Sequence, residues 1–109
     1  MPEPTADDAQ LDELRDGLRR ELARVQGRLR ALPLDRLDGE PAALARAAAQ
    51  DLADLAADAQ QRPRRSVPQL EVHGVPDQLA VTAHDVLAEG DRAALSQALD
   101  VLTALRRAL

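Results

Sequence analysis

The sequence contains no cysteine and no aromatic residue: phenylalanine, tyrosine and tryptophan are missing from all 109 positions. Without cysteine, disulfides, thiolate catalysis and cysteine metal ligands are excluded. Without aromatic rings, the chain offers no stacking platform for single-stranded nucleic acid. Isoleucine, asparagine and lysine are also missing, so all 14 basic residues are arginines. This is the usage expected of a GC-rich coding sequence, and we do not take it as a sign of anion recognition.

The apolar residues that are present, chiefly leucine, valine and alanine, make a thin core for a single domain of this length. A buried leucine or valine contributes roughly 1.5–3 kcal/mol, and alanine contributes less because it removes little apolar area from water. Ordering each residue costs about 1.5 kcal/mol. This balance favours further burial at a subunit interface.

The acidic residues outnumber the arginines, which gives a net charge of −5. A duplex-binding domain usually carries a basic face, so nucleic acid is a disfavoured partner. Residues 1–8 are acidic and lack the apolar stretch of a signal peptide. No uncharged run approaches the roughly 20 residues of a membrane span. We therefore expect a cytoplasmic protein without a membrane partner.

Residues 6–32 are predicted to form one long helix, which begins after a suitable N-cap at Thr5 and ends before Pro33. Its apolar residues recur at steps of three or four and form a narrow stripe, of the width typical of a coiled-coil seam. We predict that this stripe is a dimer seam formed by Leu11, Leu14, Leu18, Leu22, Val25 and Leu29.

The charges along this helix are segregated, with acids in its first half and arginines in its second half, where Glu21 is the exception. The predicted helix 41–61 carries an acidic edge formed by Asp51, Asp54 and Asp58. A simple antiparallel hairpin of these two helices would place that edge beside the acidic half of the first. Two antiparallel copies of the first helix would instead set acids against arginines, as would a parallel helix 41–61 from another chain. We therefore predict a homodimer.

The rest of the chain is predicted to be helical apart from its connectors. Leu34 and Leu37 are expected to turn inward within a short connector. Proline and arginine interrupt the chain after residue 61, and a possible extended stretch at Leu70–His73 is expected to be irregular instead. Gly90 suits a left-handed residue after a helix end, and Asp91 suits an N-cap. The predicted elements after the first helix are a helix at 41–61, an irregular connector at 62–75, and helices at 76–89 and 91–108.

The pattern as a whole predicts an all-α protein. It is a small bundle of about four helices with a long first helix and a C-terminal αα-hairpin, completed by dimerisation. The chain has no phosphate-binding loop, no EF-hand loop and no helical metal motif, and neither of its serines lies in a nucleophile elbow. We therefore predict no enzymatic activity and no cofactor.

Six residues are candidates for contacts with a ligand or partner. They are Arg62, Arg64, Arg65, His73, Asp77 and His84. The favoured function is a non-enzymatic protein that acts through homo-oligomeric or hetero-oligomeric contacts. Two alternatives stay open. One is a small-molecule or metal-binding helical protein that uses His73, His84 and nearby carboxylates. The other is a regulator associated with nucleic acid.

Overall fold

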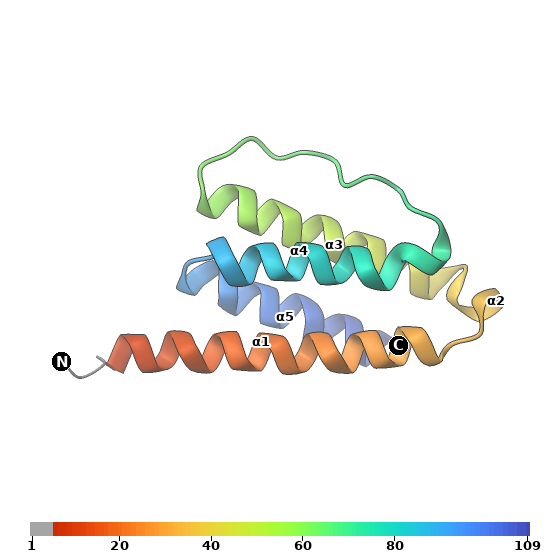
Figure 1. Ribbon diagram of the computed structural model, residues 1–109, viewed down its shortest axis with the longest axis horizontal. Coiled ribbons are helices and arrows are strands. Elements are labelled where there is room, and N and C mark those ends of the chain that lie inside the picture. Colours follow the sequence, from red (N-terminus) through yellow and green to blue (C-terminus); the bar gives the residue numbers. More distant parts are fainter. Residues whose placement is uncertain (1–5) are drawn as a thin grey trace.

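The computed structural model describes residues 6–109 and is helical along most of that length (Figure 1). Its elements are α1 (Ala6–Ala31), α2 (Leu34–Leu37), α3 (Glu40–Ala59), the 3-10 turn η1 (Val72–Gly74), α4 (Val75–Glu89) and α5 (Arg92–Ala108). The described residues contain no strand, which confirms the all-α class, and Val72 and His73 belong to η1 rather than to a strand. Four of the five α-helices are long, as predicted, and α2 adds a single turn. The predicted N-cap, Thr5, lies outside the described residues, and no described helix is long and apolar enough to cross a membrane.

The four long helices run in two directions. In Figure 1, α1 and α5 point one way and α3 and α4 the other. Helix α1 packs mainly on α5 and to a lesser extent on α4, whereas α3 packs on α4 and α5. An ion pair of 3.1 Å between Arg92 and Asp7 joins the N-terminal ends of the parallel pair α1/α5. The acidic edge of α3 therefore does not lie along α1, and the unfavourable hairpin considered above is not formed.

The core is built from leucine, valine and alanine alone. Alanines fill the inner face of α3, and these small side chains let α4 and α5 approach it closely. The largest fully buried side chains are Leu18, Val25, Leu29, Leu52, Val75, Leu79, Val86, Leu95 and Leu102. The buried alanines of α3 are Ala42, Ala45, Ala48, Ala49, Ala56 and Ala57.

The leucine stripe of α1 is part of this internal core. Leu18, Leu22, Val25 and Leu29 are at most 4% exposed, and they pack within the chain's own cluster of apolar side chains. Leu11 and Leu14 are only partly buried. Between Leu18 and Leu29 the stripe leaves no apolar surface for a second chain, so a dimer of the folded monomer cannot use this part of the stripe.

Several local expectations are corrected by the structure. Helix α3 ends at Ala59 rather than residue 61, because Gln61 adopts a left-handed φ of 54° and the N–H of Arg62 bonds back to the carbonyl of Ala57. Gly90 is not left-handed: its φ is −74°, and glycine is needed there because a Cβ would lie 2.6 Å from the carbonyl oxygen of Val86. Leu37 is buried as expected, but Leu34 is 64% exposed.

The remaining helix ends lie close to the predicted ones. The connector 62–75 is shorter than expected, because Val72–Gly74 form η1 and α4 already starts at Val75. Asp91 caps α5 as predicted, since its carboxylate accepts the N–H of Ala94 at 2.9 Å.

Glu21 is a buried carboxylate between α1 and α5, with 8% of its side chain exposed. The Nε of Arg106 donates to Oε2 at 2.8 Å, its Nη2 donates to Oε1 at 3.0 Å, and the Thr103 hydroxyl donates to Oε1 at 3.1 Å. The bonds from Arg106 lower the pKa of Glu21 below its ordinary value of 4.5, although burial opposes this. These directional contacts fix the register of the parallel pair α1/α5.

We expect the free energy of unfolding to decrease as the pH falls below about 4.5, the ordinary pKa of the Glu21 side chain. Because the pKa of Glu21 is lower in the folded state, its contribution is complete above the unfolded value and is lost as the pH falls through the folded value. Glu21→Gln should lower the free energy of unfolding by about 1–3 kcal/mol at neutral pH and flatten the acid limb. Urea denaturation at a series of pH values measures both effects.

Glu13→Gln is the matched control, because Glu13 is an exposed glutamate on the same helix. It should change the free energy of unfolding by no more than about 0.5 kcal/mol. If Glu21→Gln behaves like this control at neutral pH, the buried ion pair does not have the structural role assigned to it.

Candidate interaction surfaces and the cleft beneath the strap

Residues 62–71, which we call the strap, return the chain along α3 to the start of α4 (Figure 1). The strap is needed because α3 and α4 run in the same direction. The side chain of Gln50 holds its backbone on both sides of Ser66: Nε2 donates to the carbonyl of Arg65 at 3.0 Å, and Oε1 accepts the N–H of Val67 at 2.8 Å. Gln78 of α4 donates to the carbonyl of Pro68. Side-chain amides thus replace the backbone partners that a helix or strand would supply.

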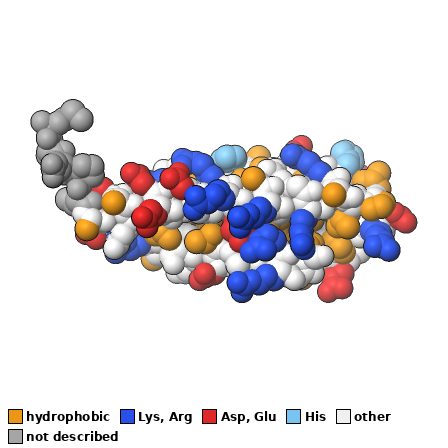
Figure 2. Space-filling model, turned by 90° about the horizontal axis from the view of Figure 1, so that it is seen from below, with side chains coloured by type: hydrophobic (Ala, Val, Ile, Leu, Met, Phe, Trp, Pro, Cys, Tyr) orange, Lys and Arg blue, Asp and Glu red, His pale blue; other side chains and the backbone are white. Residues whose placement is uncertain are grey.

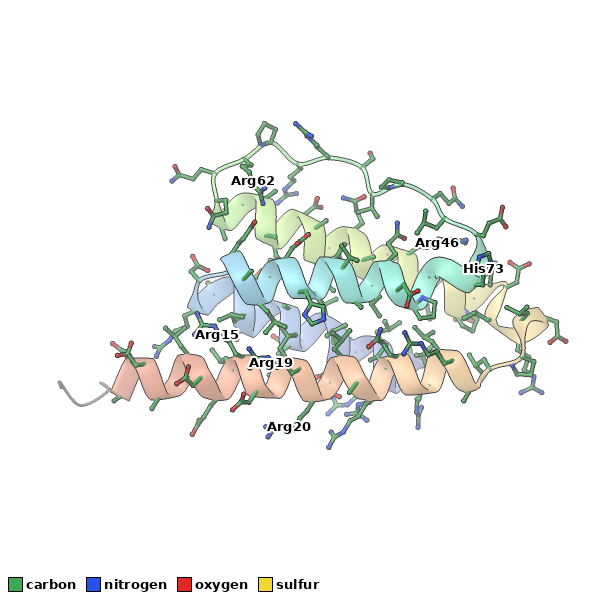
Figure 3. All side chains as sticks on the ribbon, viewed as in Figure 1. Arg15, Arg19, Arg20, Arg46, Arg62 and His73 are labelled. Carbon is green, nitrogen blue, oxygen red and sulfur yellow. The ribbon has the colours of Figure 1, made fainter. Side chains whose placement is uncertain are left out.

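Two of the three strap arginines form ion pairs with acidic residues of the same chain. Arg64 forms two hydrogen bonds to Asp58, of 3.0 and 2.7 Å, and lies 3.9 Å from Asp54. These bonds lower the pKa of Asp58 and raise that of Arg64. Arg62, seen on the strap in Figure 3, pairs with Glu89 at the end of α4. The arginine cluster and the acidic edge of α3, noted separately in the sequence, therefore meet in the fold, while the side chain of Arg65 stays exposed.

The two histidines are not brought together. His73 lies in η1 at the end of the strap (Figure 3), and His84 is exposed on α4. Their positions in the chain differ by eleven, which corresponds to about 16 Å along a helix axis. Asp77 pairs with Arg30 of α1 at 2.9 Å. Within residues 6–109, no three His, Asp or Glu side chains are placed to hold a metal ion.

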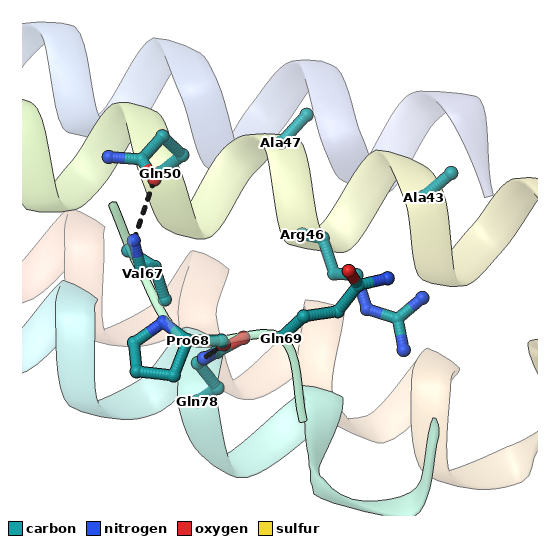
Figure 4. A pocket seen from close by; sticks show the side chains of 8 residues that line it. All are labelled: Ala43, Arg46, Ala47, Gln50, Val67, Pro68, Gln69 and Gln78. Carbon is teal, nitrogen blue, oxygen red and sulfur yellow. Dashed lines mark hydrogen bonds between the residues drawn. The ribbon is translucent and has the colours of Figure 1, made fainter. Parts of the chain in front are cut away.

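A cleft of about 390 Å³ lies beneath the strap (Figure 4). Its lining contains one cation, three amides and four apolar side chains, and no carboxylate. The lining residues are Ala43, Arg46, Ala47 and Gln50 of α3, Val67, Pro68 and Gln69 of the strap, and Gln78 of α4. The Nη2 of Arg46 donates to the carbonyl of Leu70 at 2.8 Å, but its Nε is buried without a hydrogen-bond partner.

The exposed side of α1 carries a second candidate surface. An oblique row at steps of four residues has three acids followed by three arginines, and all six are exposed. We call this row the charge ridge; it consists of Asp8, Asp12, Asp16, Arg20, Arg24 and Arg28. Figure 2, which looks onto α1, shows acidic side chains gathered towards its N-terminal end and basic ones at the middle. Arg20 points away from the bundle (Figure 3).

Comparisons with known proteins give no match, since no family model, no curated protein and no solved structure is significantly similar to this chain.

The residues that build the cleft were not among the candidates from the sequence. Arg46 and Gln50 stand one turn apart in an alanine-rich segment of α3, which is a visible signal of a polar face. What the sequence does not carry is that the strap crosses this face and that Gln78 approaches it from another helix.

Gln50→Ala is expected to loosen the strap, because it removes both hydrogen bonds to the strap backbone. Losing about 1 kcal/mol of local stability should increase trypsin cleavage after Arg64 and Arg65 roughly fivefold, if opening is fast relative to cleavage. Mass spectrometry of the fragments measures the rate at each bond, and Pro63 protects the bond after Arg62.

Gln97→Ala is the control for this experiment, since Gln97 is an exposed glutamine on α5. Cleavage of the Gln50→Ala strap at the rate of this control would show that the amide does not hold the strap down.

Proposed function

We propose that this protein acts without catalysis, by binding another polypeptide through the exposed side of α1, and that this polypeptide is a second copy of the chain. The two copies of α1 would lie antiparallel. The observation that supports this arrangement is the order of charges along the charge ridge. The ridge reverses its sign between Asp16 and Arg20, so rotation by a half-turn brings its central acids, Asp12 and Asp16, opposite arginines.

The residues that face each other across the two copies follow from their positions along α1. With the two-fold axis level with residue 18, Asp16 faces Arg20 of the second copy and Asp12 faces Arg24. A row at steps of four crosses a helix obliquely, so two such rows align when the helices cross at about 50°, the commonest class of helix packing. Ala23 and Gly27 are exposed beside the ridge, and nothing lies within 4 Å of a Cβ placed on Gly27. These small residues allow the second helix to approach.

Within one chain the ion pairs of the ridge are local contacts along α1, between residues three positions apart. Asp12 and Asp16 each contact one arginine on the same helix, at 3.6 and 3.1 Å, with side chains 76% and 63% exposed. The ion pairs found among the described residues do not include Arg20. Neighbouring like charges along the ridge mildly destabilise α1, which a partner of opposite sign would offset.

The energy expected from such contacts is small. An exposed ion pair contributes about 0–1 kcal/mol, so charge determines the orientation of the copies more than their affinity. We therefore expect a weak dimer that dissociates as salt is added. This differs from the leucine-seam dimer suggested by the sequence, because the central part of that seam is buried in the monomer.

Charge reversal tests the proposed pairing. The double variant Asp12→Arg/Asp16→Arg makes the ridge almost wholly basic, and Arg20→Asp/Arg24→Asp makes it almost wholly acidic. Each should be monomeric in sedimentation-velocity runs at low salt, because like ridges repel. An equimolar mixture of the two should form a heterodimer at least as readily as the wild type forms a homodimer.

The control for the variant Asp12→Arg/Asp16→Arg is Asp51→Arg/Asp100→Arg, which makes the same change in net charge on exposed positions of α3 and α5. It should dimerise like the wild type. A wild type that stays monomeric at low salt up to high micromolar concentration rules out the proposed dimer, and so does a mixture of the reversed variants that stays monomeric.

A further inference from the structure

Of the two neighbouring N–H donors on one edge of the Arg46 guanidinium, only one has a hydrogen-bond acceptor. Its Nη2 donates to the carbonyl of Leu70 at 2.8 Å, whereas the neighbouring Nε is buried and has no partner. A buried donor without an acceptor costs about 1–3 kcal/mol. Nε and Nη2 lie along one edge of the guanidinium, and the two N–H groups of that edge point in nearly the same direction. One carbonyl oxygen engages one of them.

A carboxylate fits this edge, because its two oxygens accept two parallel N–H bonds from one guanidinium. We propose that the cleft beneath the strap binds a small monocarboxylate, whose two oxygens replace the carbonyl of Leu70 and engage both Nε and Nη2 of Arg46. The strap carbonyl occupies the site when no ligand is bound.

The rest of the cleft restricts the ligand further. Arg46 is the only cation among the lining residues, and none of them is acidic, so the site matches a single negative charge better than a phosphate dianion. The apolar lining of Ala43, Ala47, Val67 and Pro68 suits a short aliphatic body. A volume of about 390 Å³ is at the small end of ligand pockets in general.

The strap backbone is able to move at Leu70. Leu70 is 43% exposed, and its neighbours Gln69 and Glu71 are exposed as well. The anchors from Gln50 and Gln78 hold the strap at Arg65–Pro68, before this stretch. Between Pro68 and η1, the strap backbone is hydrogen-bonded to α3 through the bond from Arg46 to the carbonyl of Leu70. The ligand therefore has to displace one hydrogen bond, and it supplies two.

Nuclear magnetic resonance reads this exchange directly, through the side-chain Nε–H signal of Arg46 and the backbone amides of Gln69–Glu71. The probes are 3-methylbutanoate, acetate and inorganic phosphate, each added at constant ionic strength to the full chain. We expect a saturable shift of these signals with 3-methylbutanoate in the millimolar range, a weaker effect with acetate, and no saturation with phosphate.

Arg46→Lys keeps the positive charge but removes the edge that carries two parallel N–H groups. The dissociation constant of 3-methylbutanoate, measured from the signals of the strap amides, should therefore rise at least tenfold. Arg65→Lys is the matched control, because the side chain of Arg65 is exposed on the strap, and it should bind like the wild type. Circular dichroism checks that both variants keep their helix content.

Three results would overturn the proposal. They are an Arg46 Nε–H signal that none of the probes moves to saturation, an Arg46→Lys variant that binds like the wild type, and phosphate binding at least as tightly as 3-methylbutanoate. If Arg46→Lys does not fold, the titration of the wild-type Nε–H signal decides alone. The outcome does not depend on the proposed dimer, because the probes bind at α3 and the dimer contacts lie on α1.

Discussion

The contact between Glu21 and Arg106 determines how this bundle is assembled. A core of leucine, valine and alanine supplies most of the apolar burial, but such side chains pack acceptably in more than one register, since packing attraction is not directional. The buried carboxylate accepts several bonds from α5, and a shift by one turn would leave its charge buried and unpaired. It therefore selects one alignment of the parallel pair α1/α5. Once that pair is aligned, α4 and α3 have only the alanine-lined space that remains.

The elements of the fold could be predicted from the sequence, and their arrangement could not. Apolar periodicity and proline positions place every long helix within about two residues, because these signals act within one or two turns. Which helices touch depends on contacts between distant segments. Glu21 was visible as the one acid among the arginines of α1, at the edge of its apolar stripe, but nothing local shows that Arg106 and Thr103 lie opposite. The narrow stripe suggested a second chain, and α5 and α4 of the same chain cover it.

The strap shows the same limit at the candidate site. The sequence offered the arginines at residues 62–65 as candidates for ligand or partner contacts and the aspartates of α3 as an acidic edge, yet Arg64 and Asp58 neutralise each other. An amide side chain that hydrogen-bonds to a backbone segment outside any helix, as Gln50 does, produces no periodic signal in a sequence. The cleft lies beneath the strap, whose backbone Gln50 and Gln78 hold by hydrogen bonds. The cleft therefore depends on the three-dimensional arrangement and could not be predicted from the sequence, whereas the order of charges along α1 could.

The helix that carries the charge ridge and the strap that covers the cleft both contact one element, the first turn of α4. From α1, Gln26 donates to the carbonyl of Pro76 at 3.2 Å and Arg30 pairs with Asp77, while the next residue, Gln78, donates to the strap at Pro68. This turn is held from both sides, and Pro76 and Gln78 are buried in it. A ligand that enters beneath the strap therefore has to move Gln69–Glu71 rather than α4. Because the strap and α1 lie on opposite sides of the bundle (Figure 1), the proposed second copy on the ridge would leave the entrance of the cleft open.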